Sequence, residues 1–406
     1  MRCPSAEGKR GHPSEGCPLF RSIRRDPTWM IRSAFVFILL VPFWRSAQAL
    51  DFRLQGQASV WALGSHDPSF QAQVGLRYVP GVTIGLPATR DWKLDAELSG
   101  NGYVSGRFRA GDALRTNAQV KPYRGWIRAG TPRFESRLGL QKISFGSATL
   151  LRPLMWFDRI DPRDPLQTTD GVYALLLRYY FPNNANAWLW GLAGNTETKG
   201  REVLPSEQWS PELGGRVQLP VPRGEVAVSC HYRRADVSGL VHIPEFVPEP
   251  AENRVGLDGK WDVGAGLWFE AMLNHAANAL PLFPWQRLAS LGADYTFRIG
   301  NGLGVMAEHM VVDYAAGVLK AGERTQLSAL SLSYPLGLLD NLRGFVYYDW
   351  MNHGMYRYLS WQRTLDNWLF SAALFWNPDR SQGMSGPAGS SAAAGKGIQL
   401  MVVFNH

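Results

Sequence analysis

Cysteine is scarce in this chain, and its positions exclude a disulfide-stabilised fold. Cys3 and Cys17 lie near the N-terminus, and Cys230 stands alone in the rest of the sequence. If residues 1–49 are removed, no intrachain disulfide can form. The mature protein must then be held together by hydrogen bonds and packing.

Charge and long apolar runs are also scarce. Only 19% of the 406 residues are charged, and the mean hydropathy is −0.18. The longest apolar run, residues 34–44, is shorter than the roughly 20 residues that a membrane-spanning helix needs. The composition therefore excludes a helical membrane protein and a disordered chain. The length suits two or three ordinary domains or one large barrel.

The sequence from Met30 has the three parts of a secretory signal peptide. Arg32 provides the basic start, residues 34–44 are apolar, and an Ala-x-Ala triplet ends at Ala49. This order predicts export and cleavage after Ala49. The alternative is a buried core helix, but the flanks match a signal peptide. Residues 1–29 carry no apolar pattern, so we expect translation to begin at Met30.

Removal of residues 1–49, the predicted N-terminal extension plus signal peptide, changes the charge of the protein. It leaves 34 Lys/Arg and 31 Asp/Glu, so the net charge falls from +8 to +3. Nucleic-acid binding calls for a dense basic patch. We therefore expect no nucleic-acid partner.

The mature part of the chain repeats one pattern, in which apolar and polar residues alternate. In "FQAQVGLRYV" (70–79) an apolar residue stands at every second position from Phe70 to Tyr78. This period of two predicts strands with one apolar and one polar face. The pattern recurs over residues 52–62, 92–100, 225–233, 254–263, 303–312, 342–350, 366–376 and 397–405.

Three features favour membrane-spanning strands over a soluble antiparallel sandwich, which shows the same alternation. The segments run to about ten residues, the length of a tilted spanning strand, whereas soluble strands have about five or six. Aromatic residues such as Trp92, Trp261 and Trp368 gather near strand ends, as in the girdles of membrane barrels. Short and long connections alternate along the chain, which is the plan of an outer-membrane barrel.

Counting strands through these connections predicts an all-β, antiparallel, up-and-down transmembrane barrel of about 18 strands over residues 50–406. A count of 16 is the alternative, because the connection at 79–91 is too long for its side. A closed barrel satisfies every backbone hydrogen bond in lipid. The expected long loops are 147–170, 195–211, 235–252, 275–285, 313–324, 351–355 and 377–396.

We interpret the connection 147–170 as a loop that folds into the lumen and narrows it. Charges of both signs held close together set a field that selects solutes, and a long loop in a compact protein tends to be functional. The alternative is a surface loop folded by local Asp–Arg pairs. The aspartate spacing is not that of a calcium-binding loop. The candidate constriction residues are Arg152, Asp158, Arg159, Asp161, Arg163 and Asp164.

The polar strand faces should line the channel. Arg124, Arg128 and Arg137 come from strands predicted to be neighbours, and such a basic patch would attract anionic solutes. Arg216 also stands at one of the polar, inward-facing positions of its strand. The alternative, left open here, is that these arginines pair with wall carboxylates and stiffen the barrel. Those carboxylates are Asp95, Glu97 and Glu135.

No motif of an enzyme, a metal site or a cofactor site emerges. His231 and His309 have no ligand spacing around them, and a Ser229–His231 pair is what polar alternation produces by chance. "GSSAAAGKG" (389–397) lacks the spacing and the final Ser or Thr of a phosphate-binding loop. We expect a non-enzymatic protein without a cofactor.

Two stretches resemble a known family. "LGLQKISFG" (138–146), read as a strand with Gln141 that runs into a long loop, and the closing "GIQLMVVFNH" (397–406) resemble the alginate-export-type porins of Gram-negative outer membranes. The resemblance implies an 18-stranded channel whose basic lumen passes anionic sugars or other small solutes, with Gln141 among the pore-lining residues. It also implies that the barrel-assembly machinery recognises the final strand.

The sequence thus predicts a porin-like barrel in the bacterial outer membrane that passes small hydrophilic solutes, with anionic solutes among the candidates, by diffusion. The alternatives are a specific exporter of an acidic polysaccharide and a non-conducting structural or adhesive barrel. The expected partners are outer-membrane lipid, lipopolysaccharide and the assembly machinery.

Overall fold

The computed structural model describes residues 51–67, 69–89, 91–238, 250–277, 284–378 and 395–406. The predicted extension and signal peptide, and most of the glycine-rich stretch 389–397, lie outside the described residues. Within the described ranges, no helix is long and apolar enough to cross a membrane. The described strands belong to one compact unit, Ala49–His406.

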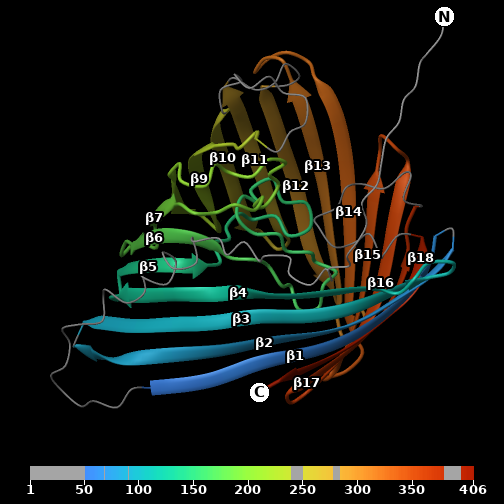
Figure 1. The fold of residues 1–406 in the computed structure, drawn as a ribbon. Helices are drawn as coiled ribbons and strands as arrows, with labels where there is room; N and C mark the ends of the chain where they lie inside the picture. The colour runs from blue at the N-terminus through green and yellow to red at the C-terminus, as the bar shows by residue number, and fades with distance from the viewer. Residues whose placement is uncertain (1–50, 68, 90, 239–249, 278–283, 379–394) are drawn as a thin grey trace, which may run out of the picture. The chain divides into compact units, whose positions relative to one another are not determined.

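The structure consists of strands joined by turns and loops (Figure 1). The strands are β1 (Asp51–His66), β2 (Phe70–Thr89), β3 (Trp92–Arg109), β4 (Arg115–Gly130), β5 (Phe134–Gln141), β6 (Val172–Tyr180), β7 (Asn186–Leu192), β8 (Glu212–Val221), β9 (Gly224–Arg234), β10 (Ala251–Asp262), β11 (Gly266–Ala277), β12 (Trp285–Phe297), β13 (Leu303–Ala315), β14 (Glu323–Pro335), β15 (Asp340–Asp349), β16 (Gly354–Leu365), β17 (Trp368–Trp376) and β18 (Lys396–Asn405).

Every strand pairs antiparallel with its neighbours in the chain, and the first pairs with the last. The sheet has 18 strands, and pairing of β1 with β18, from Gln57↔Asn405 to His66↔Lys396, closes it. The predicted all-β barrel is therefore confirmed, with 18 strands and not 16. Each described strand therefore has two neighbours, as a sheet in lipid requires, although residues 115–124 of β4 have no partner in the shorter β5.

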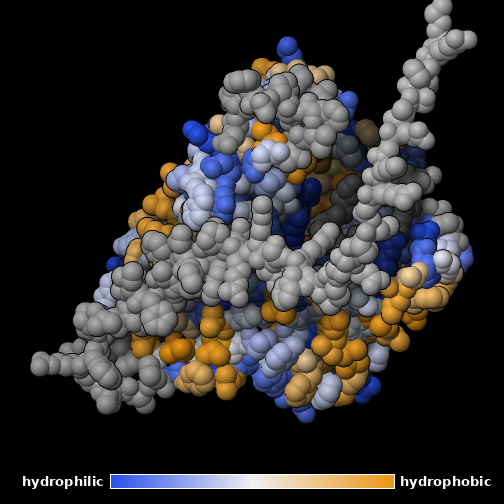
Figure 2. Space-filling view, viewed as in Figure 1, coloured by the Kyte–Doolittle hydropathy of each residue, from blue (hydrophilic) through white to orange (hydrophobic). Residues whose placement is uncertain are grey.

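The polarity of the barrel is the reverse of that of a soluble protein. On β11, the side chains of Trp268, Glu270 and Met272 are buried on the inner face, while Leu267 on the outer face is 43% exposed. On other strands the outward Leu98 and Leu291 are more than half exposed. Figure 2 shows such apolar side chains gathered on the outside of the strands. An outer surface of this kind is stable only in contact with lipid.

The prediction of a long connection over residues 79–91 was wrong. β2 continues to Thr89, and the link to Trp92 at the start of β3 is short. Pro80 lies inside the strand opposite Gly56 of β1, and the β3 pairing that pauses at Val79 and Pro80 resumes at Gly81. Proline removes one ladder donor, and here the ladder tolerates that loss. The turn signal of Pro80-Gly81 therefore misled the strand assignment.

Candidate functional site: the barrel interior

The loop between β5 and β6 begins earlier than predicted. β5 ends at Gln141, and residues 142–146 leave the wall, so the strand expected over 138–146 was too long. Ile143 and Phe145 continue the apolar alternation, but both are buried in a core cluster and do not face lipid. The fully buried Gln141 side chain donates hydrogen bonds to the carbonyls of Arg137 and Ala174 at 3.1 and 2.9 Å.

Two buried glutamates of the wall hold this loop. Glu308 of β13 accepts hydrogen bonds from the backbone N–H groups of residues 149, 150 and 151 at 2.7, 2.9 and 2.5 Å, and from Trp268 Nε1 at 3.0 Å. Glu270 of β11 accepts from the N–H groups of Ala148 and Leu154 at 2.7 and 2.9 Å. The loop therefore crosses the interior from β5 to the wall at β11 and β13.

An apolar cluster joins the loop to the inner face of the wall. Trp156 and Phe157 of the loop are buried and pack edge to face against Phe145 at ring distances of 5.3 and 6.0 Å. Phe157 also contacts Trp190 of β7 and His231 of β9 at 5.5 and 5.1 Å. This cluster supplies the interior of the barrel with a small hydrophobic core, which explains why the loop holds a defined position.

Gly146 is a position where the loop tolerates no side chain. Its φ is +101°, and a Cβ there would lie 2.3 Å from Glu270 Oε1. We expect Gly146→Ala to displace the loop from Glu270 and to increase proteolysis of residues 147–170 about tenfold. Gly111→Ala is the matched control, because Gly111 has a φ of +89° with no atom within 4 Å. Equal protection of both variants would contradict this reading.

The predicted loop charges are all present and mostly paired within the loop. Arg152 and Asp158 form a buried ion pair at 2.8 Å. Arg163 and Asp161 form a second pair at 2.8 Å. Burial alone would raise the pKa of Asp161, but hydrogen bonds and charge from Arg163 outweigh it and hold that pKa below its ordinary value. Asp164 accepts hydrogen bonds from the N–H groups of Leu166 and Thr168.

Arg159 joins this loop to the next one. Its side chain donates to the carbonyl of Gly200 at 2.7 Å and to Thr198 Oγ1 at 2.8 Å. Both acceptors lie in the connection between β7 and β8. The two long loops therefore form one body inside the barrel.

The wall arginines are also paired. Arg128 binds Asp95 through two hydrogen bonds of 2.8 and 2.7 Å, and Arg137 lies 3.2 Å from Glu135. Arg124 is buried and donates to the carbonyl of Thr169 at 3.0 Å. The structure thus brings Arg128 and Arg137 together, but with carboxylates among them. The proposed role of the patch in attracting anions stays a prediction.

Arg216 is buried rather than open to the lumen. Its guanidinium binds Asp258 of β10 at 2.6 and 2.9 Å, and Asp258 also accepts a hydrogen bond from Ser147 of the loop. Arg216 and Gln141 are covered in this conformation. They can shape a channel only by positioning the loop.

Sequence reasoning missed a second buried network, around Glu202 in the loop between β7 and β8. Glu202 lies within 3.4 Å of Lys199, Arg233 and Arg254. The network extends to Glu212, His231 and Glu252. Closely spaced charges in "TETKGRE" (196–202) resemble those of the first loop and were the available signal.

The part of the interior next to β2 and β3 is less tightly filled than the part next to β11 and β13, where the loop is anchored. On the inner faces of β2 and β3, Gln73, Arg77, Tyr103 and Ser105 remain partly exposed, and Arg128 keeps 37% of its side-chain surface exposed. The loop reaches this side at few points. One is the hydrogen bond from Arg77 to Thr168 Oγ1 at 3.1 Å.

No group of residues suited to hold a metal ion occurs in the part of the chain that the structure describes. No protein-family model and no curated protein matches the sequence. The fold, however, is similar to several solved structures. OccK7 (OpdD) of Pseudomonas aeruginosa has a TM-score of 0.52 at 9% identity, over 87% of this chain and 99% of that one.

OccK5 (OpdH) of the same organism has a TM-score of 0.51 at 11% identity, over 87% and 98% of the two chains. Wzi of Escherichia coli, described as an outer-membrane protein involved in group 1 capsule assembly and as a carbohydrate-binding β-barrel, has 0.51 at 9%, over 86% and 84%. These matches support a porin-like outer-membrane barrel fold and lend no support to the narrower alginate-export resemblance.

Proposed function

We propose that this protein is a passive channel of the bacterial outer membrane for small hydrophilic solutes, with a preference for anions. The observation that carries the proposal is the reversed polarity of the barrel. Apolar residues face outward, and on the inner faces of β2 and β3 polar side chains such as Gln73 and Arg77 stay partly exposed beside the loop. Barrels of this strand number usually enclose an aqueous path.

The proposed path runs between the inserted loop and the inner faces of β2, β3 and β4. On that side Lys121 and Arg77 add positive charge, and each contacts the loop at one point, Asp170 and Thr168 respectively. Fixed charges along a narrow path select solutes by sign. The excess of basic side chains along this wall favours anions.

The test is single-channel conductance of the refolded protein in planar bilayers, with the reversal potential measured under a salt gradient. We expect steady conductance and a reversal potential shifted toward that of the anion. Absence of current at every voltage would overturn the channel proposal. Conductance with cation preference would overturn only the anion selectivity.

A second candidate is a non-conducting barrel that binds carbohydrate. The loop contacts the wall on widely spaced strands, including a hydrogen bond from Tyr358 of β16 to the carbonyl of Arg163, and Wzi has a similar fold. A polysaccharide exporter is the related alternative. Silence in bilayers together with oligosaccharide binding would favour the second candidate.

We further propose that export removes residues 1–49, that the assembly machinery inserts the barrel, and that lipid and lipopolysaccharide surround it. The apolar outer surface supports contact with lipid. The matching parts of a signal peptide in residues 30–49 support export.

A further inference from the structure

A small pocket lies at the long-loop end of β2, β3 and β4. Its volume is about 110 Å³, and its lining is Gln71, Arg107, Arg109, Asp112, Ala113 and Arg115. The arginines of β3 and β4 belong to the inward phase of these strands. The pocket therefore opens on the interior, at the end of the barrel where β3 passes into β4.

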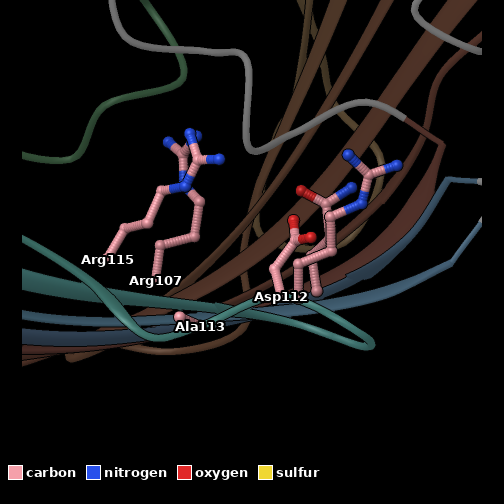
Figure 3. Close-up of a pocket in the computed structure, with 6 residues that line it drawn as sticks. Arg107, Asp112, Ala113 and Arg115 are labelled. Carbon is pink, nitrogen blue, oxygen red and sulfur yellow. The ribbon is translucent and has the colours of Figure 1, made fainter.

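Two of these arginines lie next to each other on adjacent strands, on the same face of the sheet. Arg107 and Arg115 are direct partners in the β3–β4 register. Figure 3 shows their side chains running the same way, with the guanidinium groups next to each other. Like charges in directly opposite positions destabilise a sheet. An anion held between the two guanidinium groups would relieve this repulsion.

Within the described ranges, no carboxylate is paired with either side chain. Elsewhere on the wall the pattern is different, since Arg128 is held by Asp95 and Arg216 by Asp258. The third arginine of the pocket, Arg109, donates to Ser69 Oγ at 3.1 Å. Arg107 and Arg115 thus present a doubled positive charge to the pocket.

We propose that Arg107 and Arg115 bind an oxyanion group, a carboxylate or a phosphate, on solutes that enter from the long-loop end. Guanidinium forks match the planar oxygens of such groups and bind them through two hydrogen bonds. The pocket has room for such a group and a few waters. The inference rests on the proposed channel function, of which it names the solute class.

Asp112 provides a test in which the expected change in anion affinity is the opposite of that for the arginine variants. It lines the same pocket and carries the charge that repels an anion. Removing this charge should strengthen binding, whereas general damage to the site would weaken it.

The experiment measures binding of succinate and, separately, inorganic phosphate to the full-length folded barrel in detergent by titration calorimetry. We expect Arg107→Gln and Arg115→Gln each to weaken binding about tenfold and Asp112→Asn to strengthen it. Arg343→Gln is the matched control, because Arg343 faces the interior on β15 opposite the buried Ser360 and lies outside the pocket. It should change affinity less than about twofold.

Binding of succinate alone identifies the carboxylate as the ligand, and binding of phosphate alone identifies the phosphate. Failure of the wild-type protein to bind either, or equal losses in Arg343→Gln, overturns the inference. The result is independent of conductance. A silent barrel that binds these anions through Arg107 and Arg115 would overturn the channel proposal and leave the site standing.

Discussion

Glu308→Ala should release the inserted loop from the wall and enlarge the proposed conducting path. Glu308 accepts three backbone hydrogen bonds from residues 149–151 and a fourth from Trp268. A buried N–H left without an acceptor costs about 1–3 kcal/mol. The variant loses all four acceptor contacts at once, so residues 147–170 should leave their docked position.

We expect the single-channel conductance of Glu308→Ala to rise at least twofold, with more current fluctuation, and the loop to become sensitive to protease. Glu308→Gln should have a smaller effect, because its amide keeps one acceptor oxygen but turns an NH₂ group toward the remaining donors. Glu97→Gln is the control. It removes a charge from the inner face of β3 at a position whose partners in the sheet are Thr83 of β2 and Trp126 of β4. Unchanged conductance and full protection in Glu308→Ala would contradict the anchoring role.

Glu202→Gln should be the most destabilising single change to the described barrel. Its carboxylate is fully buried and lies within 3.4 Å of three cations, those of Lys199, Arg233 and Arg254. Removing one partner of a buried ion network leaves charge uncompensated in a low dielectric, which costs about 3–5 kcal/mol. The midpoint of unfolding in guanidinium, followed by tryptophan fluorescence, should fall accordingly.

A second substitution distinguishes charge imbalance from lost packing. In the Glu202→Gln background, Lys199→Met should recover part of the stability, because two buried arginines then balance two buried carboxylates, those of Glu212 and Glu252. The recovery is partial, since Glu212 loses its contact with Lys199 and keeps only the one with His231. Glu197→Gln in the same loop is the matched control and should change the midpoint little, because Glu197 is exposed and surface substitutions have small effects. Equal losses in the two glutamine variants would show that the network does not carry the stability.

The local pattern of the chain predicted the wall of this barrel well. Alternation from Phe70 to Tyr78 and its repeats depends only on neighbours in sequence, and so do the short turns such as 130–133. The same local logic failed at Pro80, where pairing with two neighbouring strands maintained the strand through a turn signal. It also failed at Ile143 and Phe145, whose apolar phase is buried by the loop and not by lipid.

The interior could be predicted in kind but not in detail. The charges of the first loop were recognised, yet the sequence has no local feature that pairs Leu154 with Glu270 or Arg216 with Asp258. These partners are separated by 116 and 42 positions. Which carboxylate meets which donor depends on the register of distant strands, and no periodicity encodes that register.

The anchoring of the loop by β11 and β13 has a consequence for the time course of folding. The contacts of Ala148 with Glu270 and of Thr149 with Glu308 join residues 122 and 159 positions apart. Contacts of such separation close large loops of chain and form late. The loop of an assembling barrel should therefore stay undocked until the C-terminal half is in place, and should reach its position in the interior among the last steps of maturation.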